Sequence, residues 1–296
     1  MKILLLGNTG QLGWELERAL APLGEVHAID FPELNLADVD GTVRLVRETR
    51  PSVIVNATAY TAVDKAEQER ELAEAINGRA PGLLAEEALS MGAALVHYST
   101  DYVFDGAKGE PYLETDEPCP LGTYGESKLA GERSVSAVGG AYLIFRTSWV
   151  YSLRRDSFVT KVLQWSRQHR SLKLVTDQVS NPTWCRMLAE VSALLLSMAF
   201  KDPAGWIGER KGLYHLAGWG YASRMEWGNE ILSLDRNKEE QVVEEVLPAL
   251  TAEFPAPAER PLFSALNCDL FSTTFGLRLP DWQDALKLAM DSASTG

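Results

Sequence analysis

The sequence is poor in cysteine and histidine. Three cysteines, Cys119, Cys185 and Cys268, are scattered without CxxC spacing, and the four histidines are isolated. An odd, sparse set of cysteines provides neither a disulfide framework nor a zinc site, and it is typical of a reducing compartment. We therefore expect a cytoplasmic protein.

Positive charge and long apolar runs are also scarce. The net charge of −13 and the absence of a basic patch argue against nucleic acid and anionic membranes as partners. The longest apolar stretch, 188–200, is interrupted by Glu190 and Ser192, so it predicts a buried amphipathic helix rather than a membrane span. The chain begins directly on an apolar run, so we expect no secretory leader.

A glycine-rich turn follows the first apolar run. Residues 2–6 are typical of a buried parallel strand, and Gly7, Gly10 and Gly13 precede an amphipathic helix. In a dinucleotide-binding turn, such glycines permit the tight turn, the approach of backbone to a pyrophosphate, and close packing of helix on strand. The helix N-terminus also attracts phosphate. The spacing is GxxGxxG rather than GxGxxG, so an ordinary glycine-rich turn is the alternative.

An acid ends the second apolar run. Asp30 closes residues 26–30, about 20 residues after the glycines, where a carboxylate accepts hydrogen bonds from the adenosine ribose. A carboxylate there also repels a 2′-phosphate. The position therefore favours NADH, although nearby basic side chains could relax the preference.

Strand-like runs alternate with helical patterns along the chain. Further runs lie at 52–59, 94–100, 141–146, 172–175 and 213–217. This alternation predicts the α/β class, with a Rossmann-type doubly wound parallel sheet that binds ligands at the carboxyl ends of its strands.

The same pattern suggests two parts. We expect residues 1–150 to form the dinucleotide-binding domain and residues 151–296 to form mostly a smaller, interleaved α/β substrate-binding lobe. The runs near 172–175 and 213–217 are expected to rejoin the first domain. Pro81 lies inside a helical stretch, 72–90, and predicts a kink or a restart of that helix.

Tyr124 and Lys128 are the strongest catalytic candidates. Four residues apart on a helix, they share one face. An ammonium near a phenol favours phenolate, which makes a tyrosine a more effective acid–base group. His97 and His215 lie in expected strands, where we interpret them as core residues rather than catalysts.

Several motifs resemble those of a known family. They are GNTGQLGWEL, RPSVIVNATAYTAVDKAE, VHYSTDYVFDG, YGESKLAGE, FRTSWVY, DQVSNPT, GLYHLA and RPLFSALN. In this order and spacing the chain resembles the extended short-chain dehydrogenases/reductases and, within them, the dTDP-4-dehydrorhamnose reductases. The resemblance covers nearly the whole chain.

The resemblance implies an NADH- or NADPH-dependent oxidoreductase that reduces the 4-keto group of dTDP-4-dehydro-6-deoxy-L-mannose to dTDP-L-rhamnose. That reaction is the last step of dTDP-L-rhamnose biosynthesis. Tyr124 would be the general acid, and Lys128 would lower its pKa and hold the nicotinamide ribose. Thr100 would bind the carbonyl oxygen.

Further binding residues follow from the same resemblance. The coenzyme would contact Gly7, Thr9, Gly10, Gln11, Leu12, Gly13, Asp30, Asn35, Leu36, Ala57, Thr58, Ala59, Tyr60, Tyr124 and Lys128. The dTDP-keto-sugar would contact Val63, Asp64, Thr100, Asp101, Tyr102, Tyr124, Trp149, Asn181 and Arg260. For four of these a structural role is the alternative: a hydroxyl capping the strand end for Thr100, a turn acid for Asp101, a core position for Trp149 and a surface salt bridge for Arg260.

Two positions depart from the family pattern. Asn35 stands where the wider group has an aspartate near the adenine, which bears on coenzyme affinity. Some members dimerise through metal-bridged carboxylates; Glu15 matches one of these, but Arg186 stands where another acid is expected. A guanidinium cannot ligate a cation, so we expect no metal and leave monomer and homodimer open.

Two other functions remain open at this point. One is an epimerase or dehydratase that keeps its nicotinamide bound; a dehydratase would need another acid beside Asp101, where Tyr102 stands. The other is a non-catalytic regulatory subunit, which the presence of Thr100, Tyr124 and Lys128 disfavours. Net consumption of NADH separates the reductase from both.

Overall fold

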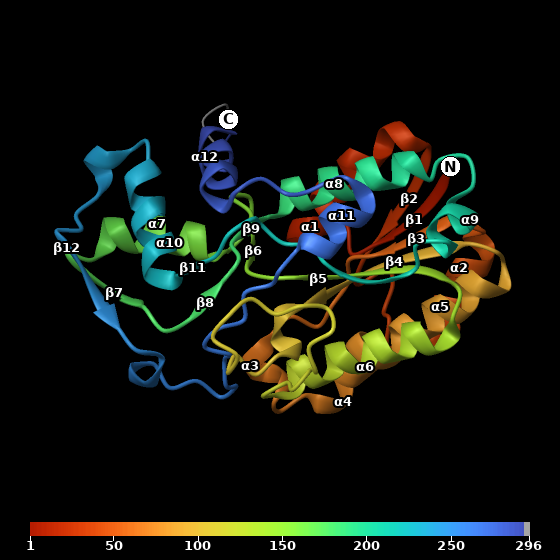
Figure 1. Cartoon of the computed structure of the whole chain (residues 1–296), viewed down its shortest axis with the longest axis horizontal. Coiled ribbons are helices and arrows are strands. Elements are labelled where there is room, and N and C mark those ends of the chain that lie inside the picture. Colours follow the sequence, from red (N-terminus) through yellow and green to blue (C-terminus); the bar gives the residue numbers. More distant parts are fainter. Residues whose placement is uncertain (293–296) are drawn as a thin grey trace.

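A parallel sheet forms the centre of the molecule. The computed structural model describes residues 1–292, and in it six strands run in the order β10-β5-β4-β3-β1-β2 (Figure 1). Every neighbouring pair in this sheet is parallel. The strands are β1 (Lys2–Leu6), β2 (Glu25–Ile29), β3 (Val53–Asn56), β4 (Ala94–Thr100), β5 (Ala141–Thr147) and β10 (Gly212–His215). The order reverses between β1 and β3, so the ligand crevice of a doubly wound sheet is expected at their carboxyl ends.

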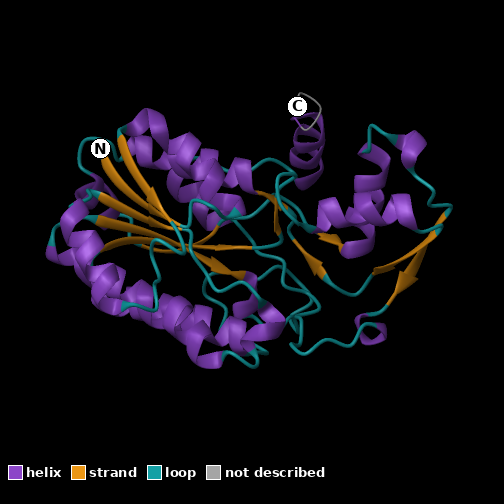
Figure 2. Cartoon of the chain, turned by 180° about the vertical axis from the view of Figure 1, so that it is seen from behind, coloured by secondary structure: helices purple, strands orange, loops and turns teal. Residues whose placement is uncertain are grey.

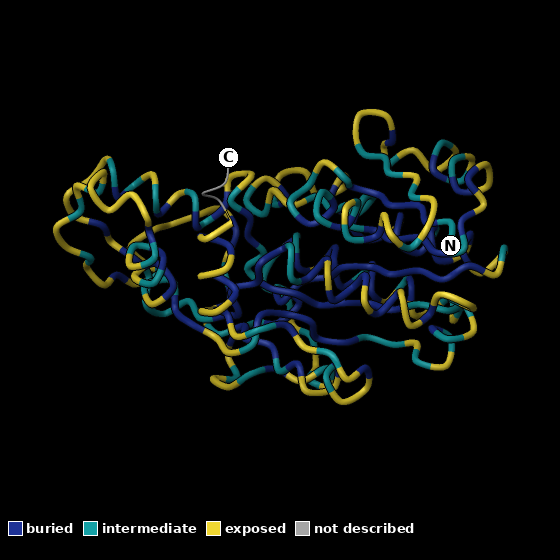
Figure 3. Tube along the Cα trace, turned by 90° about the horizontal axis from the view of Figure 1, so that it is seen from above, coloured by how far each residue is buried: buried dark blue, intermediate teal, exposed yellow. Residues whose placement is uncertain are grey.

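Helices cover both faces of this sheet. One face carries α1 (Gln11–Leu20), α8 (Cys185–Met198), α9 (Pro203–Gly208) and α11 (Asp269–Phe275), and the other carries α2 (Val39–Thr49), α5 (Ala80–Ser90) and α6 (Thr123–Val138) (Figure 1). Alternate residues of one strand serve the two cores: Ile3 and Leu5 pack with α1, whereas Leu4 and Leu6 pack with α2 and α5. Figure 3 shows buried segments running through the middle of the molecule, with exposed segments around them. The predicted fold class is confirmed.

A smaller lobe lies beside the sheet (Figure 2). It contains α7 (Phe158–Gln168), α10 (Arg224–Leu234), the parallel pair β7 (Ser171–Val175) and β12 (Glu245–Ala249), and the antiparallel pair β8 (Val179–Ser180) and β11 (Ala222–Ser223). At the junction are β6 (Val150–Tyr151), β9 (Thr183–Trp184) and α12 (Trp282–Ser292). Short segments complete the chain: α3 (Val63–Ala66), α4 (Arg70–Ala73), a π-helix (Glu74–Arg79), and 3₁₀ turns at Ala21–Leu23, Asp101–Val103, Lys238–Glu240 and Thr251–Glu253.

One of the two runs expected to rejoin the large sheet does so. The run near 213–217 becomes β10, beside β5, as predicted. The prediction for 172–175 is wrong, because β7 pairs with β12 in the smaller lobe. The physical reason is its alternation: Leu172 and Leu174 are buried while Ser171 and Lys173 are exposed, which suits a strand covered on one face only.

Two helical expectations are confirmed. The stretch 188–200 lies mostly within α8, whose inner residues pack on α1. Pro81 stands in the first turn of α5, where the helical bonding changes from π to α, so the helix is irregular at the point where proline supplies no N–H. Among the described residues 1–292, none of the helices is long and apolar enough to cross a bilayer.

A buried ion pair joins α6 to the sheet. The Glu132 carboxylate on α6 accepts two hydrogen bonds from the Arg146 guanidinium on β5, at 2.9 and 2.7 Å. Ser99 on β4 donates its hydroxyl to the same carboxylate. Both charged side chains are almost entirely buried. The pair therefore fixes how α6 lies against two strands.

Replacing Glu132 with glutamine should destabilise the fold. The substitution leaves the Arg146 charge buried without its counter-ion, which costs about 3 kcal/mol or more of the free energy of unfolding. Urea denaturation measures the loss. The exposed pair Arg170–Glu244 supplies the control, and Glu244→Gln should have little effect. Equal stabilities of the two variants would contradict this role for Glu132.

Candidate active site

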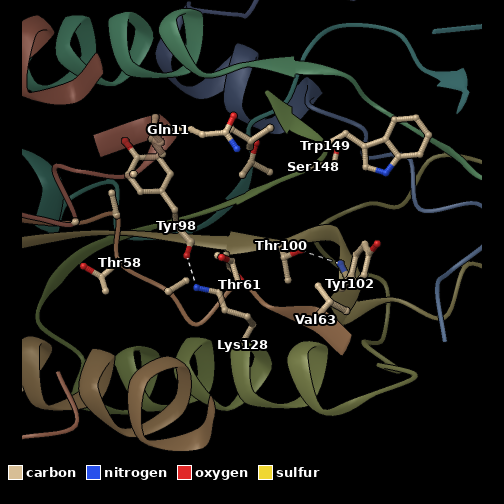
Figure 4. Close-up of a pocket in the computed structure, with 18 of the residues that line it drawn as sticks. Gln11, Thr58, Thr61, Val63, Tyr98, Thr100, Tyr102, Lys128, Ser148 and Trp149 are labelled. Carbon is tan, nitrogen blue, oxygen red and sulfur yellow. Dashed lines mark hydrogen bonds between the residues drawn. The ribbon is translucent and has the colours of Figure 1, made fainter. Parts of the chain in front are cut away.

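One cleft collects most of the predicted site residues. It has a volume of about 750 Å³ and runs along the carboxyl ends of β1, β3, β4 and β5 (Figure 4). From the predicted set it is lined by Gly7, Thr9, Gly10, Gln11, Leu12, Asp30, Ala57, Thr58, Ala59, Val63, Thr100, Asp101, Tyr102, Tyr124, Lys128 and Trp149. The glycine turn and the catalytic candidates therefore face one space.

The glycine turn has the geometry that a dinucleotide needs. Gly7 has φ +91°, and a Cβ there would lie 2.8 Å from Thr58 Oγ and 2.9 Å from the Ala57 carbonyl carbon. A Cβ on Gly13 would lie 1.9 Å from the Gly7 oxygen, so this glycine allows α1 to pack against the turn. Within residues 1–292, no side chain caps the N-terminus of α1, so N–H groups of its first turn are free to donate. Free donors at a helix N-terminus suit a pyrophosphate.

Asp30 is tied to the same turn. Its Oδ2 accepts from the backbone N–H of Thr9 at 3.1 Å and from the Thr9 hydroxyl. Its Oδ1 accepts from the N–H of Phe31. The carboxylate thus stays at the end of β2, on the cleft wall. This is the position at which it would meet an adenosine ribose.

The three catalytic candidates come from two elements. Thr100 ends β4, and Tyr124 and Lys128 lie one turn apart on α6. Lys128 is buried, and its Nζ donates to the Tyr98 carbonyl at 2.6 Å and lies 3.5 Å from His97 Nε2 (Figure 4). Burial lowers the pKa of Lys128 to about 8.

The phenol of Tyr124 is kept protonated. Burial raises its pKa, and the neighbouring Thr100 hydroxyl opposes that shift. The Lys128 ammonium donates to the Tyr98 carbonyl. A protonated phenol is the form that a general acid requires. The lowering of the Tyr124 pKa by Lys128 remains a prediction.

Trp149 and Arg224 form the far wall of the cleft. Trp149 has φ +40°, an uncommon conformation for a bulky residue. Its ring stacks on Trp227 at 5.5 Å, and the Arg224 guanidinium carbon lies 3.5 Å from its ring centre. Trp149 is therefore both a cleft residue and part of the core packing. Burial lowers the pKa of Arg224 to about 10, so the group stays charged.

Sequence reasoning missed the two arginines of the cleft, Arg155 and Arg224. Arg224 is the first residue of α10 and lies between Ser223 and Glu226, which form the capping box of this helix. Arg155 follows β6 in an irregular loop. No local pattern distinguishes either arginine from a surface residue.

Seven predicted residues lie outside the cleft lining: Gly13, Asn35, Leu36, Tyr60, Asp64, Asn181 and Arg260. Gly13 acts through helix packing, as described above. The Asn35 side chain accepts from the N–H of Ala37, and Leu36 is buried in the core beneath β1. The Tyr60 hydroxyl donates to Glu69 at 2.6 Å.

The other three have partners of their own. Arg260 binds Asp64 with two hydrogen bonds, at 2.7 and 2.9 Å. The Asn181 amide donates to the Gly220 carbonyl at 2.8 Å and accepts from the N–H of Leu266 at 2.7 Å. The Asn181 contacts join the C-terminal segment to the smaller lobe, and the Arg260–Asp64 pair joins the same segment to α3. In this structure they occupy the polar groups assigned to the substrate.

The position considered for a bridging metal holds an ion pair instead. Arg186 on α8 donates to Glu15 on α1 at 3.3 Å. A guanidinium on this carboxylate does not fit a cation site. Across residues 1–292, no group of three or more histidine, cysteine or acidic side chains could hold a metal ion.

Comparison with known proteins adds independent evidence. Residues 1–295 match the family described as RmlD substrate binding domain. A dTDP-4-dehydrorhamnose reductase of Burkholderia thailandensis is 40% identical over 293 residues, which are 98% of this chain and 98% of that protein.

Solved structures point to the same family. The dTDP-4-dehydrorhamnose reductase of Clostridium acetobutylicum superimposes with a TM-score of 0.90 at 36% identity, covering 100% of both chains. The enzyme of Bacillus anthracis, in complex with NADP, has a TM-score of 0.87 at 32% identity and covers 99% of this chain and 100% of its own. The resemblance seen in the motifs is thereby confirmed, and the chain belongs to the dTDP-4-dehydrorhamnose reductase family.

Proposed function

We propose that this chain reduces the 4-keto group of dTDP-4-dehydro-6-deoxy-L-mannose to dTDP-L-rhamnose, the last step of dTDP-L-rhamnose biosynthesis, with NADH or NADPH. The observation that carries the proposal is the single cleft that joins the glycine turn to Thr100, Tyr124 and Lys128. The family membership and the NADP-bound relative support the same reaction.

The chain's own groups would handle the proton and the charge. When bound, the nicotinamide coenzyme supplies a hydride to carbon-4 of the sugar. Tyr124 donates a proton to the forming alkoxide, since its phenol is protonated. Thr100 donates a hydrogen bond to the same oxygen, and the buried Lys128 provides positive charge beside the reacting centre.

The nucleotide part of the substrate carries negative charge that the cleft can meet. Arg224 projects into it against Trp149, and for residues 1–292 it is not found in a salt bridge. Guanidinium groups bind phosphates with paired hydrogen bonds. Arg224 is thus a better candidate for binding the diphosphate than Arg260, because the guanidinium group of Arg260 already donates two hydrogen bonds to Asp64.

Location and assembly belong to the same proposal. The three cysteines are free thiols, which suits the reducing cytoplasm. Glu15 is paired with Arg186, so a homodimer, if formed, would not depend on a bridging cation at this position.

Tyr124→Phe should abolish most turnover. The substitution keeps the ring and removes the proton donor, so we expect kcat to fall about 10²–10⁴-fold while the Kd for NADH changes little. Steady-state oxidation of NADH with the enzymatically prepared keto sugar measures kcat, and fluorescence titration measures Kd. The wild-type protein must consume NADH stoichiometrically with sugar. An epimerase would convert the sugar without net consumption, and a regulatory subunit would convert none.

Asp30→Ala should shift coenzyme choice towards NADPH. Removing the carboxylate removes repulsion of a 2′-phosphate, so the ratio of kcat/KM values for NADPH and NADH should rise on the order of ten-fold. Asp30→Asn is the matched variant, because it can still accept the Thr9 hydrogen bonds. If neither variant moves the ratio, Asp30 does not contact the adenosine ribose.

Chelation should leave the protein intact. Because Arg186 already neutralises Glu15, we expect the mass in solution and kcat to be unchanged by EDTA and by added magnesium. Light scattering and the coupled assay measure the two quantities. A fall in mass that magnesium restores would mean that Glu15 exchanges Arg186 for carboxylates and a cation.

A further inference from the structure

A buried hydroxyl–carboxyl cluster lies directly behind Thr100. Asp101 Oδ2 accepts from Ser180 Oγ at 3.0 Å and from Ser264 Oγ at 2.5 Å, and its Oδ1 accepts from Thr100 Oγ at 3.2 Å. All four side chains are buried. The cluster joins the end of β4, the start of the smaller lobe at β8, and the C-terminal segment.

The hydrogen-bond capacity of Thr100 is limited. A hydroxyl has one proton to donate and two lone pairs that accept. One lone pair of Thr100 accepts from the N–H of Tyr102 at 3.2 Å (Figure 4). While Asp101 is ionised, its Oδ1 competes with the neighbouring Tyr124 for the single hydroxyl proton of Thr100, and the full negative charge of the carboxylate attracts that proton more strongly. It cannot then be donated to a substrate carbonyl.

Protonation of Asp101 reverses this bond. A neutral Asp101 can donate from Oδ1 to the second lone pair of Thr100, which frees the Thr100 proton for the cleft. Ser180 and Ser264 both bind Oδ2, so they leave Oδ1 as the atom that faces Thr100. Only hydrogens change place: Asp101 gains a proton on Oδ1, and the Thr100 hydroxyl hydrogen rotates from Asp101 towards the cleft.

We propose that Ser180 and Ser264 are positioning residues that hold Asp101 so that its carboxyl group controls whether Thr100 donates its proton to the substrate carbonyl. The inference rests on the reductase function proposed above. It adds a set of residues whose role is to direct one hydrogen bond.

The surroundings of Asp101 determine the pH range in which its carboxyl group titrates. Burial raises the pKa of Asp101 to about 6, and the hydroxyls of Ser264, Ser180 and Thr100 oppose that shift. The other charged or titratable groups that face it are Tyr102, Tyr124 on α6 and Arg224 on α10. Burial raises the pKa of both tyrosines, and Arg224 stays charged, so none of these groups titrates near pH 6.

The direction in which kcat changes with pH follows from which protonation state of Asp101 frees Thr100. Protonated Asp101 frees Thr100, so kcat should fall as the pH rises through the pKa of Asp101. With a pKa of about 6, the protonated fraction of Asp101 falls roughly 25-fold between pH 5.5 and 7.5, and we expect kcat of the wild type to fall by about that factor. Lys128, with a pKa of about 8, accounts for any further fall at higher pH.

Asp101→Asn is the decisive variant. Its amide can accept from both serines and donate to Thr100, as the protonated acid does, so kcat should vary less than about two-fold between pH 5.5 and 7.5. Ser264→Ala removes a donor that favours the carboxylate, so its fall in kcat should move to higher pH by about half a unit or more. The control is Ser166→Ala. Ser166 is a buried serine in α7 that donates to the Leu163 carbonyl, and its replacement should leave the pH dependence of kcat unchanged.

A second readout does not need turnover. Infrared difference spectra follow the protonated carboxyl of Asp101, which should titrate in the wild type, shift upwards in pH in Ser264→Ala, and vanish in Asp101→Asn. Wild-type protein without reductase activity would refute the proposed function but leave this titration intact. An unchanged fall in kcat in Asp101→Asn, or an infrared midpoint that Ser264→Ala does not move, would overturn the inference.

Discussion

The position of α6 against the sheet is the constraint on which the site depends. Tyr124, Lys128 and Glu132 recur every fourth residue, so they lie on one face of this helix. Glu132 is held by Arg146 and Ser99, and Lys128 donates to the carbonyl of Tyr98 on β4. Because burying these charges is costly without partners, α6 has one favourable register on β4. That register brings Tyr124 beside Thr100.

The end of the cleft at the glycine turn depends on close backbone approach instead. Gly7 lies against the β3 end at Ala57 and Thr58, and Gly13 lies against Gly7, so side chains are excluded where the strand order reverses. Positive charge is supplied locally. A chain with a net charge of −13 still presents Lys128, Arg155 and Arg224 to one cleft. A site for an anionic substrate therefore does not require a basic protein.

The two lobes meet where distant segments share hydrogen bonds. Asp101 contacts Ser180 and Ser264, and Asn181 binds backbone groups of Gly220 and Leu266. These residues come from the end of β4, the smaller lobe and the C-terminal segment. The support behind the cleft residue Asp101 is thus assembled from segments that no local motif connects, and its geometry depends on how the lobes dock.

The sequence by itself determined the features that arise from local chemistry. Apolar runs and glycine spacing predicted β1, β4 and the turn at Gly7, since strand burial and tight turns depend on neighbouring residues. The four-residue spacing and the motif order indicated the pair Tyr124 and Lys128 and the family. Tertiary structure alone decided the partner of β7, the entry of Arg224 into the cleft, and the pairing of Arg260 with Asp64. Each of these contacts joins residues that are far apart in the chain. Which residues meet is decided by how the folded elements pack, and the neighbouring sequence carries no signal for it.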